Sequence, residues 1–214
     1  MAHFLRSNQP WAQLVERSNI SIREIQAVDE RNPSSTSLTP SVSFSPVAVP
    51  HRAELSDTVA YLITASRKRT GVDIASPGLE HPTETPGDPS KRSGGAGDAL
   101  RLFYCPDTDG WSGWKKSIRD WCEEVDVALV DATFYDKLEL KGRDMSEVSH
   151  PVVEDTVKEL VDCTAEVVLT HLNHTNPLLS KDSPERATVL AKGFKVATFG
   201  MEWTLEVEET PRNP

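Results

Sequence analysis

The 214-residue sequence contains only three cysteines, and no two of them form a C-x-x-C pair. An odd number of cysteines without such pairs argues against a disulfide framework and against a zinc ribbon. Reduced thiols in a cytoplasmic protein are the simpler interpretation. The sequence also lacks an apolar run long enough to span a bilayer. Residues 1–10 lack the apolar centre of a signal peptide, so neither secretion nor a membrane partner is expected.

Basic residues are in the minority, because 23 Lys and Arg face 33 Asp and Glu, for a formal net charge of −10. A surface that coats nucleic acid needs a basic footprint, so we expect no nucleic-acid partner. Hydrophobic residues make up only 37% of the chain, which predicts that part of it lies outside any core. No pattern in the sequence specifies an oligomeric state.

The distribution of apolar residues divides the chain into short elements separated by polar segments. Residues 29–41 are rich in Ser, Pro, Thr and Asn and predict a loop. Residues 66–98 hold several prolines and a Ser-Gly-Gly-Ala-Gly run, which predicts a disordered insertion within a single domain that covers residues 1–214. The expected helices are 11–17, 113–124, 151–161 and one beginning at Ser183 and ending at Gly193, and the expected strands are 20–25, 42–49, 58–64, 100–105, 125–130, 167–170, 194–198 and 202–207.

Strand–helix–strand units recur through residues 100–207, which predicts an α/β fold whose sheet is partly parallel. Four polar residues fall at or just beyond the ends of expected strands, namely His51, Asp107, Asp131 and His171. The strand ends of open α/β sheets form the functional rim. Imidazole and carboxylate are ligands that zinc and iron accept, so these residues are candidates for part of a metal site.

Each of these residues also has a structural interpretation. A single His at a strand end is more often structural than a ligand. Asp107 and Asp109 lie in a Pro-Asp-Thr-Asp-Gly segment that is typical of a turn. Asp131 precedes Ala-Thr and could cap a loop or helix.

Two further polar features stand out in the second half of the chain. His150 directly precedes Pro151 and an expected helix, where it could serve as a general acid or base or as an ordinary cap. Residues 169–177 place two His and two Asn after an apolar strand, and this dense polar cluster is our strongest candidate for an active rim.

Several segments, in order, resemble the coenzyme PQQ (pyrroloquinoline quinone) biosynthesis protein B family of the metallo-β-lactamase superfamily. Each motif alone is weak, but their joint order is specific. The segments are Val49-Pro50-His51-Arg52 with Ser56-Asp57-Thr58, Tyr104-Cys105-Pro106-Asp107-Thr108-Asp109 with Trp111, Asp131-Ala132-Thr133, and His171-Leu172-Asn173-His174-Thr175-Asn176-Pro177 followed by Ser183-Pro184-Glu185-Arg186.

The resemblance implies a metallo-β-lactamase-like αββα sandwich, of which this chain would form the C-terminal portion. It implies that His51, Asp107 and His171 are metal ligands and that His150 is a catalytic residue. The implied cofactor is zinc or iron, and the implied activity is metal-assisted hydrolysis or oxidation in quinone cofactor biosynthesis. A small-molecule or peptide-derived substrate of tyrosine type follows from the same resemblance.

The superfamily's H-x-H-x-D-H motif does not occur in the 214 residues. Three explanations stay open: the chain is a fragment, it is a truncated gene model, or it is a shortened relative that lost the site. In the last case it would be a non-catalytic remnant or an interaction protein of the same fold. The absence of the first half of the sandwich would also leave an apolar sheet face uncovered.

Overall fold

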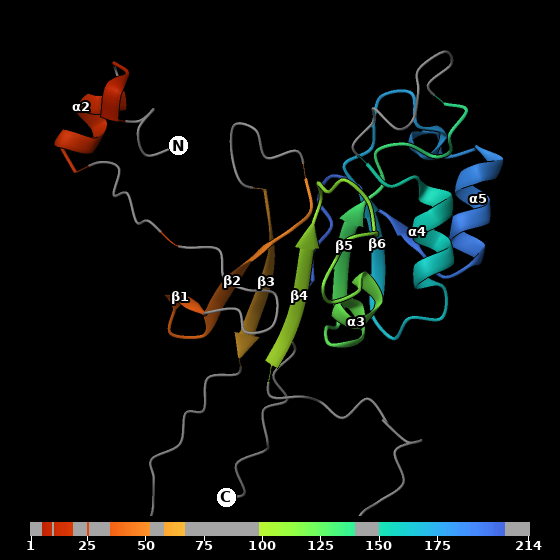
Figure 1. Cartoon of the computed structure of the whole chain (residues 1–214), viewed down its shortest axis with the longest axis horizontal. Coiled ribbons are helices and arrows are strands. Elements are labelled where there is room, and N and C mark those ends of the chain that lie inside the picture. The colour runs from red at the N-terminus through yellow and green to blue at the C-terminus, as the bar shows by residue number, and fades with distance from the viewer. Residues whose placement is uncertain are drawn as a thin grey trace, which may run out of the picture.

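The computed structural model describes residues 6–9, 11–18, 25, 35–51, 58–66, 99–139 and 150–203. These residues contain one mixed sheet of seven strands, which lie side by side in the same order as in the sequence (Figure 1). The strands are β1 (Thr36–Thr39), β2 (Val42–Ala48), β3 (Val59–Ser66), β4 (Ala99–Cys105), β5 (Val127–Asp131), β6 (Glu166–Thr170) and β7 (Lys195–Val196). The helices are α2 (Trp11–Glu16), α3 (Ile118–Glu123), α4 (Val153–Leu160), the short 3-10 helix η2 (Pro177–Leu179) and α5 (Pro184–Ala191).

The first four strands form an antiparallel meander. Of the loop expected over residues 29–41, residues 29–34 lie outside the described residues, and β1 corrects the remainder, because the chain turns at Pro40 and pairs Thr36 with Phe44. The Thr39 hydroxyl accepts the backbone N–H groups of Ser41 and Val42 and so closes this turn. Composition favours a loop there, but pairing to a neighbouring strand outweighs local preference in a short edge strand.

Strands β4 to β7 run parallel to one another. Helices α3, α4 and α5 connect them, as parallel neighbours require a crossover of this kind. The expected α/β fold with a partly parallel sheet is therefore confirmed. None of the helices within the described residues is long and apolar enough to cross a membrane.

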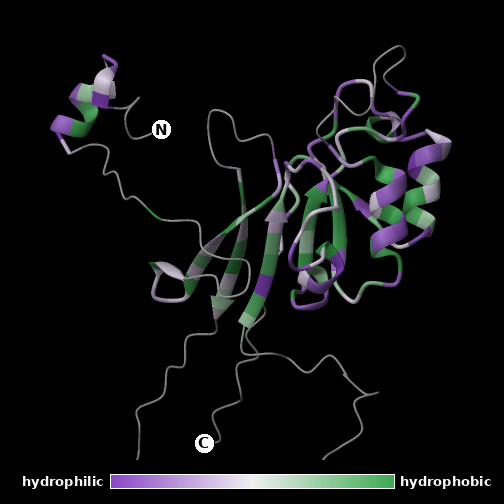
Figure 2. Ribbon diagram, in the orientation of Figure 1, coloured by the Kyte–Doolittle hydropathy of each residue, from purple (hydrophilic) through white to green (hydrophobic). Residues whose placement is uncertain are grey.

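One face of the sheet is covered by these helices and carries the main core. Phe103 on β4 stacks on Trp121 of α3, with ring centroids 5.1 Å apart and an interplanar angle of 2°. Val130 and Leu169 continue this face across β5 and β6, and both are fully buried. Figure 2 shows that the strands are hydrophobic and that the outer surfaces of the helices are hydrophilic. This distribution is typical of one layer of helices packed on a sheet.

The opposite face of the sheet is also apolar. Strand pairing aligns Phe44, Ile63, Leu102 and Val127 in one row across four strands. Tyr104, in the neighbouring row, is 37% exposed, and Phe44, Ile63 and Leu102 are half-buried. This face is therefore less completely buried than the helical side.

Two helices begin later in the structure than the sequence predicts, and capping residues determine the start of one of them. Helix α3 begins at Ile118 rather than near Gly113, because Ser117 and Asp120 form a reciprocal capping box. Gly113 has a positive φ of 83°, which removes it from helical geometry. Helix α4 begins at Val153, two residues later than expected. Helix α5 is confirmed, with Ser183 accepting the Arg186 N–H as N-cap and Gly193 following its end.

Two expected strands near the end of the chain are not confirmed in full. Residues 194–198 contain only the two-residue strand β7. Of residues 202–207, the described Glu202 and Trp203 lie outside any strand, and the remainder lie outside the described residues. The expected strand over 20–25 and the expected insertion over 66–98 also lie almost entirely outside the described residues.

Candidate metal centre

Five strands of the described sheet, β2 and β4 to β7, run in the same direction and end at the same edge. Strand β3 is antiparallel to both β2 and β4, so β2 points the same way as β4 to β7. The segments that follow β2, β4 and β6 carry His51, Asp107 and His171, and Asp131 is the last residue of β5. The topology thus explains why residues far apart in sequence meet.

Asp107 lies between two of the histidines. Its Oδ1 atom is 3.2 Å from His51 Nε2 and 3.7 Å from His150 Nδ1. This oxygen is inaccessible to solvent and makes no hydrogen bond of good geometry within the described part of the chain. A buried carboxylate oxygen without such a partner is costly, so its position calls for a proton or a cation.

Asp131 is fully buried and organises the centre. Its Oδ2 atom lies 2.7 Å from His150 Nδ1 and accepts the backbone N–H of Thr108 at 3.2 Å. Its Oδ1 atom accepts the backbone N–H and the hydroxyl of Thr133, at 2.9 and 2.7 Å. The carboxylate is therefore held rigidly by four contacts.

Thr133 connects this carboxylate to both neighbouring imidazoles. Its Oγ1 atom lies 3.2 Å from His150 Nδ1 and 3.0 Å from His171 Nδ1. Such contacts fix ring orientation, which is how partners behind the ligands tune a metal site. The Asp131-Ala132-Thr133 segment thus supplies both an acidic group and the hydroxyl that positions its partners.

Two pKa values in the centre are displaced by mutual contact. Burial by itself would raise the pKa of Asp131, but the hydrogen bond from His150 and the nearby His171 ring outweigh burial and lower it. The Asp131 carboxylate, whose Oδ1 atom lies 3.9 Å from His171 Nδ1, raises the pKa of His171 against the opposing effect of burial. The buried group is therefore a carboxylate that attracts positive charge.

His171 has a left-handed backbone, with φ at 61°. This conformation is uncommon for a residue with a side chain and is retained where the surroundings enforce it. The surroundings here include the Thr170 carbonyl, which accepts the Ala132 N–H at 2.9 Å, and Asn173, whose N–H donates to the Thr133 carbonyl at 3.0 Å. These bonds turn the chain sharply at the end of β6 and direct His171 towards Thr133.

One ligand atom from each of Asp107, Asp131, His150 and His171 can be chosen so that all lie within 4.8 Å of one another. Two ligands of a tetrahedral zinc ion lie roughly 3.3 Å apart, given metal–ligand bonds of about 2.0–2.1 Å. The spacing is therefore compatible with a shared cation after small adjustments. The donor set of two imidazoles and two carboxylates suits zinc and iron.

The structure brings together all the residues that the sequence had singled out at strand ends. His51 lies at the margin, in contact with Asp107 but outside the four-residue group. His150, expected to be catalytic, lies inside the group. Asp131 was only a strand-end candidate, and the Thr133 hydroxyl had no expected role. The signal for Thr133 was its position two residues after a carboxylate at a strand end.

The polar cluster over residues 169–177 divides into different roles. His171 joins the metal centre, whereas His174 is exposed and contacts its neighbour Asn173 at 3.1 Å. Asn176 is buried, and its side-chain amide donates to the carbonyls of Ala132 and Thr133. One histidine of this cluster therefore faces the centre, and the buried amide supports the loop that holds Asp131.

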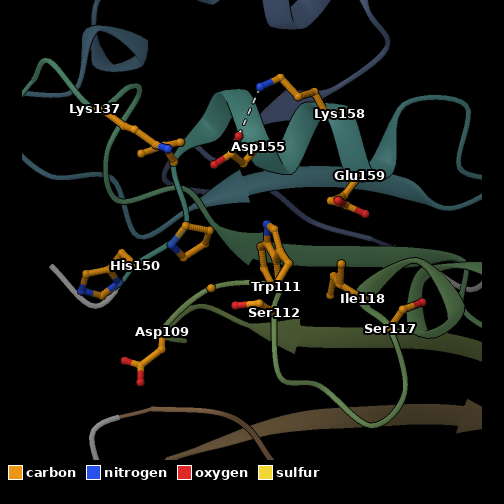
Figure 3. Close-up of a pocket in the computed structure, with 13 residues that line it drawn as sticks. Asp109, Trp111, Ser112, Ser117, Ile118, Lys137, His150, Asp155, Lys158 and Glu159 are labelled. Carbon is orange, nitrogen blue, oxygen red and sulfur yellow. Dashed lines mark hydrogen bonds and ion pairs between the residues drawn. The ribbon is translucent and has the colours of Figure 1, made fainter. Parts of the chain in front are cut away.

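A cavity of about 600 Å³ adjoins the centre on the side of His150. It lies between α3 and α4, with Trp111 on its wall and the side chains of Lys137 and Lys158 at its margin (Figure 3). The Trp111 indole donates to Thr156 at 2.9 Å, which fixes the ring against α4. The volume falls in the range of pockets that hold small molecules.

Comparisons with known proteins show what the chain is similar to in sequence and in fold. A family model described as a beta-lactamase superfamily domain matches residues 94–172. Coenzyme PQQ synthesis protein B of Stutzerimonas stutzeri is 33% identical over 153 residues, which are 65% of this chain and 47% of that protein. The corresponding protein of Ectopseudomonas mendocina is 35% identical over 113 residues, or 49% of this chain and 36% of that protein.

Among solved structures, zinc-bound PqqB from Methylobacterium extorquens superposes with a TM-score of 0.59 at 21% identity. The match covers 92% of this chain and 56% of that one. At this identity the likeness concerns the fold. This chain spans less than half of the length of these two curated relatives.

Residues 94–172 are similar to the beta-lactamase superfamily domain, and the mixed sheet with its layer of helices is similar in fold to PqqB. In sequence, part of the chain is similar to coenzyme PQQ synthesis protein B. The resemblance expected from the sequence is thereby confirmed.

Proposed function

We propose that this protein is a metal-dependent member of the metallo-β-lactamase fold that carries out metal-assisted hydrolysis or oxidation. The observation that carries the proposal is the convergence of Asp107, Asp131, His150 and His171, whose ligand atoms lie within 4.8 Å of one another. These side chains come from separate strand ends and loops, so their meeting is a property of the fold.

The proposed ion is zinc or iron, held by these four residues. The buried Asp107 Oδ1 without a hydrogen bond supports this assignment, because a cation would satisfy it. The similar PqqB of Methylobacterium extorquens is zinc-bound in its crystal structure, which favours zinc here. His51, 3.2 Å from the same oxygen, would orient Asp107 or complete the ligand set.

The bound ion would supply Lewis acidity and lower the pKa of a coordinated water. The chain's own residues would keep the ligands in place. Asp131 holds the His150 ring through its Oδ2 atom, and Thr133 contacts both His150 and His171. Such a preorganised set needs little rearrangement when it acts.

A second role for His150 is favoured by its 2.7 Å contact with Asp131. In this arrangement His51, Asp107 and His171 would hold the ion, and the His150–Asp131 pair would hold and transfer a proton. The two arrangements differ in what happens when His150 is replaced by Ala. Loss of the metal identifies a ligand, whereas retained metal with lost activity identifies a proton carrier.

The proposed substrate is a small or peptide-derived molecule. The 600 Å³ cavity beside His150 supports this size class. Its wall combines the Trp111 ring with lysine and carboxylate side chains, which suits a polar molecule that also has a flat apolar part. The resemblance to coenzyme PQQ synthesis protein B favours a related step in quinone cofactor formation.

Metal binding by the purified chain tests the proposal. We expect close to one equivalent of zinc after equilibrium dialysis, measured by elemental analysis. In His171→Ala we expect at least about 100-fold weaker binding, because a direct ligand should matter more than the partners behind it. His174→Ala is the matched control, since this exposed histidine lies three residues away outside the four-residue group.

Equal metal content in wild type, His171→Ala and His174→Ala would contradict the proposed centre. No zinc or iron in the wild-type protein would also contradict it. That result would favour the alternative, a non-catalytic binding protein of the same fold.

A further inference from the structure

The hydrogen bonds behind the metal centre determine which atom of His171 is available to an ion. His171 is a ligand in both arrangements described above, so this inference rests on the proposed function. A neutral imidazole carries one proton, on Nδ1 or on Nε2, and only the other nitrogen has a lone pair for a metal. The hydrogen-bond partner of the ring selects between these two tautomers.

The Asp131 carboxylate fixes the direction of the hydrogen bonds around it. It accepts one backbone N–H at each oxygen, from Thr108 at Oδ2 and from Thr133 at Oδ1. An ionised carboxylate can only accept hydrogen bonds. Its Oδ2 atom is 2.7 Å from His150 Nδ1, so the proton between them is on the histidine. Its Oδ1 atom is 2.7 Å from the Thr133 hydroxyl, so this hydroxyl donates to the carboxylate.

The Thr133 hydroxyl has a single proton, which Asp131 receives. Towards His171 the same oxygen can therefore only accept, and it lies 3.0 Å from His171 Nδ1. The Nδ1 atom must then carry the proton of this contact. The distance from His171 Nδ1 to Asp131 Oδ1 is 3.9 Å, too long for a hydrogen bond, so Thr133 is the partner of this nitrogen. His150 Nδ1, 3.2 Å from the same hydroxyl, already donates to Asp131 at the shorter distance.

Backbone hydrogen bonds hold Thr133 beside His171. The Ala132 N–H donates to the Thr170 carbonyl at 2.9 Å, directly before both residues. The Asn173 N–H donates to the Thr133 carbonyl at 3.0 Å, just after them. The contact between the hydroxyl and Nδ1 is therefore fixed by the fold on both sides, as expected of a partner that orients a metal ligand.

The rest of the His171 ring is accessible. The side chain is 46% exposed, and its Nε2 atom makes no hydrogen bond within the described part of the chain. An accessible ring nitrogen without a proton is the form of imidazole that a metal ion binds.

We propose that Thr133 is a positioning residue that holds the proton of neutral His171 on Nδ1 and leaves Nε2 to bind the ion. Without the hydroxyl, Nδ1–H loses its acceptor, and the tautomer with the proton on Nε2 blocks the ligand atom. Serine keeps the hydroxyl and therefore this role. Valine keeps the shape of threonine but not the hydroxyl.

Nitrogen-15 NMR of the metal-free protein tests the tautomer directly. At about pH 9, above the ordinary histidine pKa of about 6.5, we expect a neutral His171 ring with its proton on Nδ1. Long-range proton–nitrogen spectra distinguish protonated from unprotonated ring nitrogens, and His171→Ala assigns the signals. Thr133→Ser should keep the wild-type pattern, whereas in Thr133→Val the proton should move to Nε2 in most molecules. The signals of the exposed His174 should be the same in all these proteins.

Zinc affinity measures the consequence for the metal centre. Thr133→Val should bind zinc at least about tenfold more weakly than wild type, and Thr133→Ser should stay within about threefold of it. Thr188→Val is the matched control, because it removes a threonine hydroxyl that donates to the Pro184 carbonyl in α5 instead of contacting the centre. This control should bind zinc as wild type does.

A wild-type His171 that carries its proton on Nε2 at about pH 9 would overturn the proposal, as would a Thr133→Val variant that keeps the proton on Nδ1. The wild-type spectrum decides even if Thr133→Val fails to fold. Failure of the proposed function has a different signature. A wild-type protein that binds no zinc contradicts the metal centre and the role of Nε2 in it, whereas the tautomer is determined without metal.

Discussion

The antiparallel strands β1 to β4 and the parallel strands β4 to β7 belong to one sheet but contribute differently to the candidate metal centre. The parallel part has helices over one face, and the ends of its strands β4, β5 and β6 carry Asp107, Asp131 and His171 to one edge. Of the described strands that belong to the antiparallel part alone, β2 ends at that edge, and His51 follows it. The carboxyl ends of parallel strands all lie at one edge of a sheet, so the functional side chains that follow them gather there. The carboxyl ends of antiparallel strands alternate between the two edges of the sheet.

The largest contrast between the two parts should appear in the core. Phe103→Ala removes a ring that is fully buried against Trp121 of α3 and should cost about 3–5 kcal/mol in the free energy of unfolding. Phe44→Ala on β2 removes a half-buried ring and should cost about 1–2 kcal/mol. Urea unfolding of both variants measures the difference, and equal losses would mean that both faces of the sheet are equally packed.

Replacing the buried carboxylate should be nearly as severe. Asp131→Ala leaves the backbone N–H groups of Thr108 and Thr133 without their acceptor and should cost about 3 kcal/mol in the metal-free protein. The exposed Asp109 provides the control, because Asp109→Ala should change the unfolding free energy by less than about 0.5 kcal/mol. If Asp131→Ala were as stable as wild type, Asp131 would not organise this edge.

The contribution of the antiparallel part to the metal centre should be smaller than that of the parallel part. His51 contacts Asp107 but lies outside the four-residue group, so His51→Ala should weaken zinc binding by about tenfold. His171→Ala should weaken it at least about tenfold further. Competition against a chelator of known zinc affinity ranks the two variants, and a larger loss in His51→Ala would reverse the comparison.

The smallest effect is expected at the outer strands of the parallel part. Lys195 donates to Glu166, and Trp203 donates to the same carboxylate at 2.7 Å, so the pKa of Glu166 is lowered in the folded protein. A lowered pKa stabilises the fold above the ordinary pKa of 4.5 and loses this effect as the pH falls through the folded-state pKa. Glu166→Gln should cost less than about 1 kcal/mol at pH 7, because half of the Lys195 side chain is exposed.

The pH dependence separates this contribution from ordinary packing. The unfolding free energies of wild type and Glu166→Gln should converge as the pH falls below 4.5, where the wild-type carboxylate becomes protonated. A difference that stays constant from pH 7 to pH 3 would assign the effect to something other than charge.

The sequence predicted the strands best where apolar residues were continuous. Val127 to Val130 and Val167 to Leu169 form β5 and β6 because buried parallel strands need such runs. It failed for β1, whose polar residues pair only because β2 lies beside them. It also placed the start of α3 too early, because a capping box is a stronger boundary than the apolar pattern before it.

The sequence by itself determined which residues could act, because imidazoles and carboxylates at strand ends are visible in the order of residues. His51, Asp107, Asp131 and His171 were identified in this way. Only the tertiary structure decided how they are arranged: His150 within the four-residue group, His51 at its margin, and Thr133 between two imidazoles. The physical reason is that distances between residues far apart in sequence depend on strand direction and loop packing, which local pattern does not encode.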